Sequence, residues 1–195
     1  AGGTETTRTA CMPYEGQCVN GQLIEQAWRT MPNHCGSCDA THFLTDDHMC
    51  QECPKGYSCD GSSKRTRCLP GFYADGGESQ CHECGDDSKH SQHEADQCST
   101  CKVGSYTSGG TAKTRTTCVS CPSGYSCDGT SQQTLCPSGH YSPGGDDRCY
   151  QCGTDNMYSV AGAASCSKCG AGHYTEGGTI ATRSSCKPYE GRCDN

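Results

Sequence analysis

Cysteines recur at fixed spacings along most of this chain, and this feature constrains the fold more than any other. Residues 53–120 align without a gap onto residues 121–188, with 33 of 68 positions identical and all eight cysteines of each segment in register. Such a pattern is typical of a tandem array, in which one small structural unit repeats the same covalent framework.

A longer period overlaps the first one. Residues 2–20 align without a gap onto residues 177–195, with 12 of 19 positions identical. Residues 11–52 form a shorter unit, so that the segments 11–52, 53–120 and 121–185 together make up one 175-residue period. The chain opens at Ala1, with neither an initiator Met nor a hydrophobic leader. We expect a processed product or a window of something longer, in which the next copy begins at residues 189–195.

The apolar residues are too few for an ordinary hydrophobic core. Leu, Ile, Val and Phe together number 12 of 195, a level that in most chains predicts disorder. The 22 cysteines instead favour the disulfide frameworks of small secreted modules, and therefore an extracellular or cell-surface location. A formal charge of −7 with 15 Lys and Arg argues against nucleic-acid partners, and no apolar run is long enough for membrane insertion.

Each unit repeats a short pattern of cysteine, glycine, tyrosine, Gly-Gly and a closing cysteine, as in "CPSGHYSPGGDDRC" (136–149) and "CGAGHYTEGGTIATRSSC" (169–186). The Gly-Gly pair permits positive φ at the tip of a two-stranded turn, and the Tyr ring can cover the neighbouring disulfide. Over roughly residues 35–186 the chain resembles the ephrin-receptor-like cysteine-rich repeats, relatives of tumour necrosis factor receptor and growth-factor-receptor modules. The resemblance implies an elongated stack of small β-loops in cell-surface, adhesive or matrix proteins, without catalytic residues.

Disulfide pairing follows most simply if each loop closes on itself. The predicted bonds are Cys18–Cys35, Cys38–Cys50, Cys53–Cys59, Cys68–Cys81, Cys84–Cys98, Cys101–Cys118, Cys121–Cys127, Cys136–Cys149, Cys152–Cys166 and Cys169–Cys186. An interleaved scheme, as in some receptor modules, stays open. Either scheme leaves Cys11 and Cys193 over, because their equivalents Cys186 and Cys18 take partners from the neighbouring part of the period. We therefore expect these two cysteines to form disulfides between copies.

Metal binding is the main alternative use of the cysteines. The stretch "CGSCDATHFLTDDHMCQEC" (35–53) has the paired C-x-x-C layout of a zinc ribbon, but the regularly placed Cys59, Cys68, Cys127 and Cys136 fall outside any such motif. Acidic turns such as "DGG", "GGDDRC" and "TDDHMC" could hold calcium, although none matches a known calcium loop and Asp is a common turn former. We expect no metal and no other cofactor.

One segment departs from the repeated pattern. In "NGQLIEQAWRTMP" (20–32), Leu23, Ile24, Ala27, Trp28 and Met31 fall on one helical face, Asn20 is a plausible N-cap and Pro32 ends the helix. The sequence therefore predicts one short helix near residues 21–31. Its apolar face is either a small private core against the Cys18–Cys35 bond or a contact with a neighbouring unit. We favour the contact, because these five residues hold the only Trp.

The fold class expected from these features is a small disulfide-rich array of short β-loops. Its units are residues 1–52, 53–120, 121–188 and the start of the next copy at 189–195. The 175-residue repeat favours a structural subunit of an extracellular filament or surface appendage, with copies of itself as partners. A receptor or adhesion fragment and a zinc-stabilised scaffold are the alternatives. The Thr-rich tracts 4–9 and 111–117 suggest O-linked glycans, and no recurring constellation predicts an enzyme.

Overall fold

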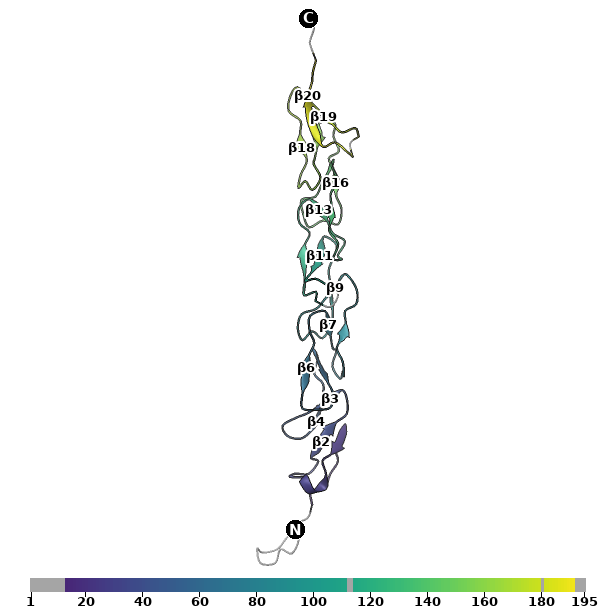
Figure 1. Ribbon diagram of the computed structural model, residues 1–195, viewed down its shortest axis with the longest axis vertical. Coiled ribbons are helices and arrows are strands. Elements are labelled where there is room, and N and C mark those ends of the chain that lie inside the picture. Colours follow the sequence, from purple (N-terminus) through teal and green to yellow (C-terminus); the bar gives the residue numbers. More distant parts are fainter. Residues whose placement is uncertain (1–12, 112–113, 180, 192–195) are drawn as a thin grey trace, which may run out of the picture. The chain divides into compact units, whose positions relative to one another are not determined.

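The computed structural model describes residues 13–111, 114–179 and 181–191. The chain forms two compact units, residues 1–84 with 91–98 and residues 85–90 with 99–195. Within each unit the described residues form two-stranded antiparallel hairpins that follow one another in chain order (Figure 1). The predicted tandem array of short β-loops is therefore confirmed. The predicted boundaries after residues 52 and 120 follow the sequence repeat, do not coincide with the two units, and stay a prediction.

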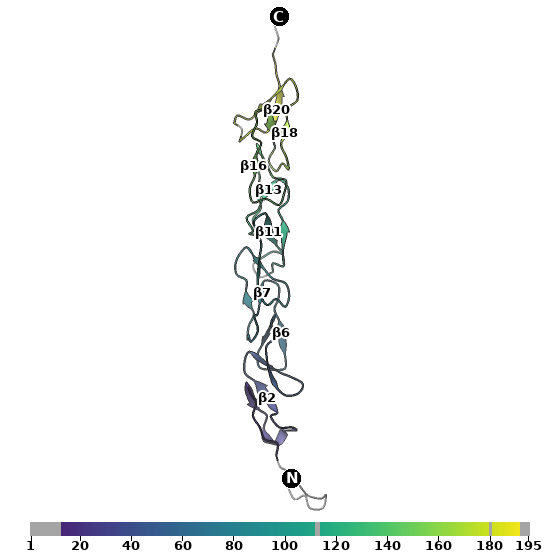
Figure 2. The same cartoon turned by 180° about the vertical axis from the view of Figure 1, so that it is seen from behind.

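The first unit contains four of the described hairpins and one turn of 3₁₀ helix, Gln26–Trp28. The hairpins are β1 (Gly21–Leu23) with β2 (Cys35–Cys38), β3 (His42–Leu44) with β4 (Cys50–Glu52), β5 (Tyr57–Cys59) with β6 (Arg65–Arg67), and β7 (Phe72–Tyr73) with β8 (His82–Glu83). Figure 2 shows the same hairpins from behind. The strands are so short that backbone pairing alone would leave each hairpin marginal in water.

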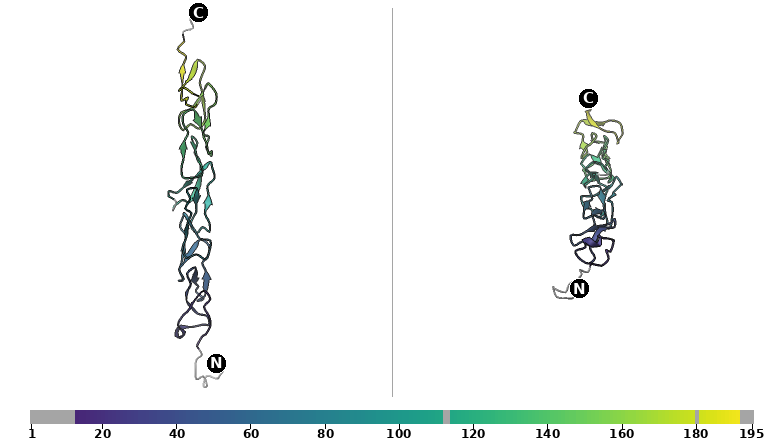
Figure 3. Two further views of the ribbon diagram at one scale, coloured as in Figure 1. Left: turned by 90° about the vertical axis from the view of Figure 1, so that its right-hand side faces the viewer. Right: turned by 60° about the horizontal axis from the view of Figure 1, so that its bottom comes forward.

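The second unit continues the series with six described hairpins. They are β9 (Lys89–His90) with β10 (Ser99–Thr100), β11 (Ser105–Ser108) with β12 (Thr117–Ser120), β13 (Tyr125–Ser126) with β14 (Thr134–Leu135), β15 (His140–Tyr141) with β16 (Tyr150–Gln151), β17 (Met157–Tyr158) with β18 (Ser167–Lys168), and β19 (His173–Glu176) with β20 (Ser185–Pro188). Figure 3 gives two further views.

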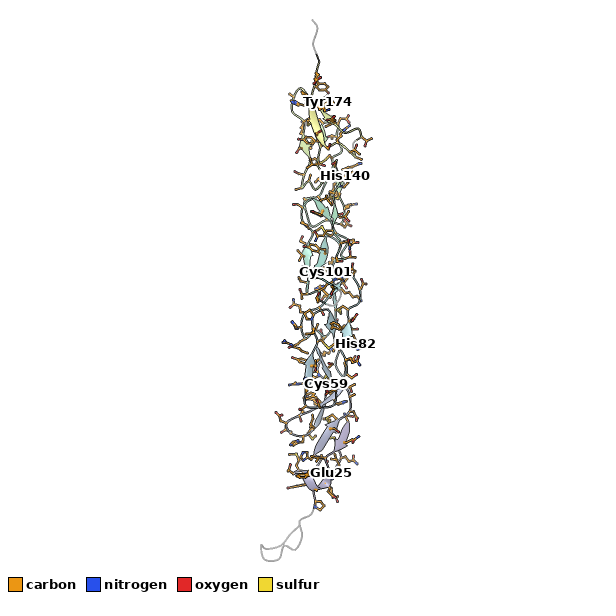
Figure 4. The ribbon with its side chains drawn as sticks, viewed as in Figure 1. Glu25, Cys59, His82, Cys101, His140 and Tyr174 are labelled. Carbon is orange, nitrogen blue, oxygen red and sulfur yellow. A yellow bond between two sulfur atoms is a disulfide. The ribbon has the colours of Figure 1, made fainter. Side chains whose placement is uncertain are left out.

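In the described part of the chain, ten disulfides take the place of a hydrophobic core. They join the same ten pairs that loop closure predicts, with Cα atoms 5.2 to 5.7 Å apart and no interleaving. Among the described residues, every buried apolar side chain except Phe43 and Ala74 is a cysteine. Tyr57 packs against a cluster of Phe43, Cys53 and Cys59, of which Figure 4 labels Cys59.

Backbone hydrogen bonds within and between hairpins repeat with the shorter of the two sequence periods. Gly56 N donates to Ala74 O and accepts at its own carbonyl from Cys68 N; Gly124 makes the same pair of bonds with Ser142 and Cys136. Both glycines have positive φ, +78° and +80°. A Cβ at Gly124 would lie only 2.1 Å from the carbonyl oxygen of Gly162. The glycine is therefore required twice, for its backbone conformation and for the close approach of the β17–β18 hairpin, which holds Gly162.

Candidate functional site

The segment after β1 is the first candidate site, and the structure corrects its predicted conformation. Only the single 3₁₀ turn at Gln26–Trp28 is helical; Asn20 adopts φ +60° in a turn and caps no helix. Leu23 pairs with Cys35, and Ile24 N donates to His34 O at 3.0 Å, so the hairpin extends through both residues. A two-turn helix is marginal by itself, whereas strand pairing is reinforced here by the Cys18–Cys35 bond.

The five residues of the predicted apolar stripe do not share one face in the structure. Leu23 and Ile24 are half-buried in the hairpin, where Ile24 Cα would lie 3.0 Å from a Cβ on Gly36. Ala27, Trp28 and Met31 are exposed, Trp28 by 69%. An assembly contact through the five residues stays a prediction. Of the five, only Ala27, Trp28 and Met31 are exposed enough to take part in it.

Polar side chains that the sequence did not single out hold this segment in place. Arg29 Nε donates to Ile24 O at 3.0 Å and its Nη1 to Tyr14 O at 3.2 Å. Asn33 Oδ1 accepts from Gln17 N at 2.8 Å. These residues occur in the unit that is not duplicated in full, so no internal repeat could have marked them.

His34 is the one buried histidine in the described part of the chain. Its ring centroid lies 4.0 Å from that of His48, and its Nδ1 accepts from Thr30 N at 3.2 Å, so Nδ1 carries no proton. Burial lowers the pKa of His34 below its ordinary value, and electrostatic interactions with His48 and Arg29 lower it further. The neutral ring is therefore the form that the folded loop selects.

Acidification should loosen the loop around Trp28. Because the folded pKa of His34 lies below its unfolded value, its contribution to stability is present above about pH 6.5 and is lost as the pH falls below that value. We expect the fluorescence of Trp28 to change as the pH falls below about 6.5 and the Thr30 bond breaks. His34→Gln keeps an acceptor and cannot titrate, so an identical transition in that variant would assign the change to another group.

Two clusters of metal-ligand residues occur in the described part of the chain. One contains Cys18, Cys35 and Cys50; in the other, His90 Nδ1 lies 3.5 Å from Cys118 Sγ and 3.8 Å from Cys101 Sγ. Each of these sulfurs is already bound in a disulfide. Zinc binds thiolates, so neither cluster is a zinc site while the disulfides are intact.

Aspartates at the turns act on the backbone. Asp60 Oδ1 accepts from Ser62 Oγ at 2.6 Å and Ser62 N at 3.0 Å; Asp128 makes the same bonds with Thr130, at 2.6 and 2.9 Å. The hydroxyl and then the N–H lower the pKa of both aspartates. Within the described residues, carboxylates form no cluster of three that could hold a cation. These aspartates are turn formers.

An arginine at the equivalent position of both repeats binds the turn that precedes the last two hairpins of its repeat. Arg115 pairs with Asp87 and donates to Asp86 O at 3.2 Å; Arg183 pairs with Asp155 at 3.1 Å and donates to Thr154 O at 3.1 Å. The sequence carries a signal for this contact, because arginine and aspartate are each identical between the two repeats. Both pairs are structural, and they position the last hairpin of each repeat.

Cys11 and Cys193, for which inter-copy disulfides are expected, lie outside the described residues. No helix in the described part of the chain is long and apolar enough to cross a membrane. The ten disulfides indicate folding in an oxidising, secreted-type environment. Neither a scan of family models nor a search of curated proteins finds a match to this chain, so the resemblance to ephrin-receptor-like repeats stays a prediction.

Proposed function

We propose that the protein is a structural subunit of an extracellular filament or surface appendage, in which copies of a 175-residue repeat follow one another head to tail. The observation that carries this proposal is the identity of 12 of 19 positions between segments 2–20 and 177–195. A contact that joins the end of one copy to the beginning of the next does not form a closed ring. It therefore propagates a fibre.

Two features of the fold support this proposal. Each hairpin is stabilised by its own disulfide, so a long array can form without a growing hydrophobic core. Trp28 is 69% exposed on the first unit, and a large exposed aromatic side chain is the kind of residue that anchors a protein interface. O-linked glycans on the Thr-rich tracts are part of the same proposal, as the surface coat of an extracellular fibre.

Replacement of Trp28 by alanine tests the proposal. We expect electron microscopy and sedimentation to show long particles for the wild-type protein and shorter ones for Trp28→Ala, with a loss of about 2 kcal/mol per contact. The exposed Val160 in the second unit provides the matched control, since Val160→Ala should leave assembly unchanged. A wild-type protein that remains monomeric at high concentration would refute the filament and favour a receptor or adhesion fragment.

A further inference from the structure

One backbone contact between successive hairpins occurs once in each unit. In the first unit, β3 binds the turn after β5 through Thr41 N to Cys59 O, Gly61 N to His42 O, and Leu44 N to Ser62 O, at 3.3, 3.1 and 3.0 Å. In the second unit, β11 binds the turn after β13 through Gly104 N to Cys127 O, Gly129 N to Ser105 O, and Thr107 N to Thr130 O, at 2.9, 3.1 and 3.1 Å. The contact therefore has a fixed set of three bonds.

The last described hairpin, β19–β20, presents the same edge. Tyr189 N donates to Gly172 O at 2.8 Å, as Cys121 N does to Gly104 O at 2.9 Å. With that bond, the pairs His173–Pro188 and Thr175–Cys186 are non-hydrogen-bonded ones, so the His173 carbonyl and the Thr175 N–H point away from β20. Within the described residues, these two groups and the Gly172 N–H have no partner.

The space beside this edge is also open. Gly172 has φ +75°, close to the +81° of Gly104, yet a Cβ at Gly104 would lie 2.2 Å from Gly145 O and a Cβ at Gly172 would meet no described atom within 4 Å. Asp87 is covered in part by Ser131, whose Oγ donates to it at 3.0 Å. The side chain of the equivalent Asp155 is 91% exposed, against 45% for Asp87. Figure 4 labels Tyr174, which marks this edge.

The turn Cys18–Gly21 has the features that the edge requires. Asn20 has φ +60°, like Gly61 and Gly129 at the same place in the two filled contacts, and Val19 beside it is 70% exposed. Asp39 N donates to Asn20 O, so Gly21 and Cys38 form a non-hydrogen-bonded pair and the Gly21 carbonyl points away from β2. In sequence, the same turn begins again at Cys193–Asn195, which lies outside the described residues.

We infer that the edge Gly172–Thr175 binds the turn Cys18–Gly21 of the following copy, which is a neighbouring subunit of the assembly. The bonds are Gly172 N–H to the Cys18 carbonyl, Asn20 N–H to the His173 carbonyl, and Thr175 N–H to the Gly21 carbonyl. Gln22 stands where Ser131 stands in the filled contact and donates to Asp155. This inference rests on the proposed function, because it needs copies in series.

The junction between copies is slightly wider than the contacts inside a unit. A Cβ at Gly61 would lie 2.3 Å from Cys38 O, and one at Gly129 would lie 2.9 Å from Cys101 O. Asn20 carries a Cβ at this place, so the turn stands farther from the hairpin than in those two contacts. Asn is the residue other than glycine that most readily adopts this left-handed conformation, which suits it to the position.

Thr175→Pro tests the contact, with Thr175→Ala as its matched control. Both variants lose the bond that Thr175 Oγ1 donates to Asp155 O at 2.8 Å, but only proline also removes the Thr175 N–H. That N–H points away from β20, so the hairpin keeps its own backbone bonds. We expect Thr175→Pro to keep all ten described disulfides and to weaken association at least about tenfold in sedimentation, while Thr175→Ala associates like the wild type.

Amide hydrogen exchange on the wild-type protein separates this inference from the proposed function. The amides of Gly172 and Thr175 should exchange at least about tenfold more slowly in assembled protein than in the dispersed chain, while Gly104 and Thr107 are protected in both. Long particles in which Gly172 and Thr175 stay unprotected would overturn the docking site and leave the filament standing. A chain that never assembles would overturn both.

Discussion

Reduction of the disulfides is expected to unfold the whole protein. The ten bonds close loops whose ends are 6 to 17 residues apart, and a closed loop of about 15 residues contributes about 3 kcal/mol by constraining the unfolded chain. Domains have an unfolding free energy of only about 5–15 kcal/mol, so the loss of ten such contributions exceeds the stability of the folded protein. The few Leu, Ile, Val and Phe side chains cannot replace them.

Circular dichroism and amide exchange before and after a reductant would measure this unfolding, with thiol-labelling mass spectrometry to count free cysteines. We expect no free thiol among the paired cysteines of the native protein and complete loss of amide protection after reduction. A metal chelator is the control and should change nothing, because the described sulfurs are oxidised. Several free thiols with bound zinc, or hairpins that stay protected after reduction, would contradict the disulfide framework.

Gly124→Ala is expected to have the second largest effect. The new Cβ would lie 2.1 Å from Gly162 O, and the backbone at φ +80° is one that residues with a side chain adopt at a cost. Either the β17–β18 hairpin, which holds Gly162, would have to move away, or Gly124 would shift and break its bonds with Ser142 and Cys136. We expect a loss of about 3–5 kcal/mol in unfolding free energy, measured by denaturant unfolding with the disulfides intact.

Gly172→Ala in the dispersed chain is the matched control for this variant. Its φ of +75° imposes the same backbone strain, but its Cβ would meet no described atom within 4 Å. We therefore expect a loss of only about 1 kcal/mol, and the difference between the two variants gives the energy of hairpin packing. Equal losses of unfolding free energy in both variants would show that backbone strain alone causes the loss. The contact between Gly124 and Gly162 O would then adjust without cost.

Much of the fold could be predicted because covalent chemistry and glycine conformations are local. The cysteine spacing made the ten observed bonds the simplest scheme, since cysteines separated by only 6 to 17 residues close most easily on each other, and the structure excludes the interleaved alternative for these cysteines. The Gly-Gly pairs predicted tight turns, and Gly76 and Gly77 both have positive φ. The shorter sequence repeat predicted that one hairpin arrangement recurs, and the equal bonds at Gly56 and Gly124 confirm this.

The segment around Trp28 shows why the rest could not be predicted. Apolar residues at helical spacing are a weak signal over two turns, and the competing hairpin depended on a strand farther along the chain, Cys35–Cys38. The roles of Arg29 and His34 depended on which backbone groups that hairpin brought beside them.

The sequence by itself determined the covalent framework, the turns and the period of this protein, because each depends on residue types at fixed spacings in the chain. Only the tertiary structure decided which backbone groups successive hairpins use to bind one another, since those bonds join separate hairpins through carbonyls that every residue carries, such as Gly104 N with Cys127 O. For the same reason, the sequence predicts the open edge at Gly172–Thr175 only through its equivalence to Gly104–Thr107.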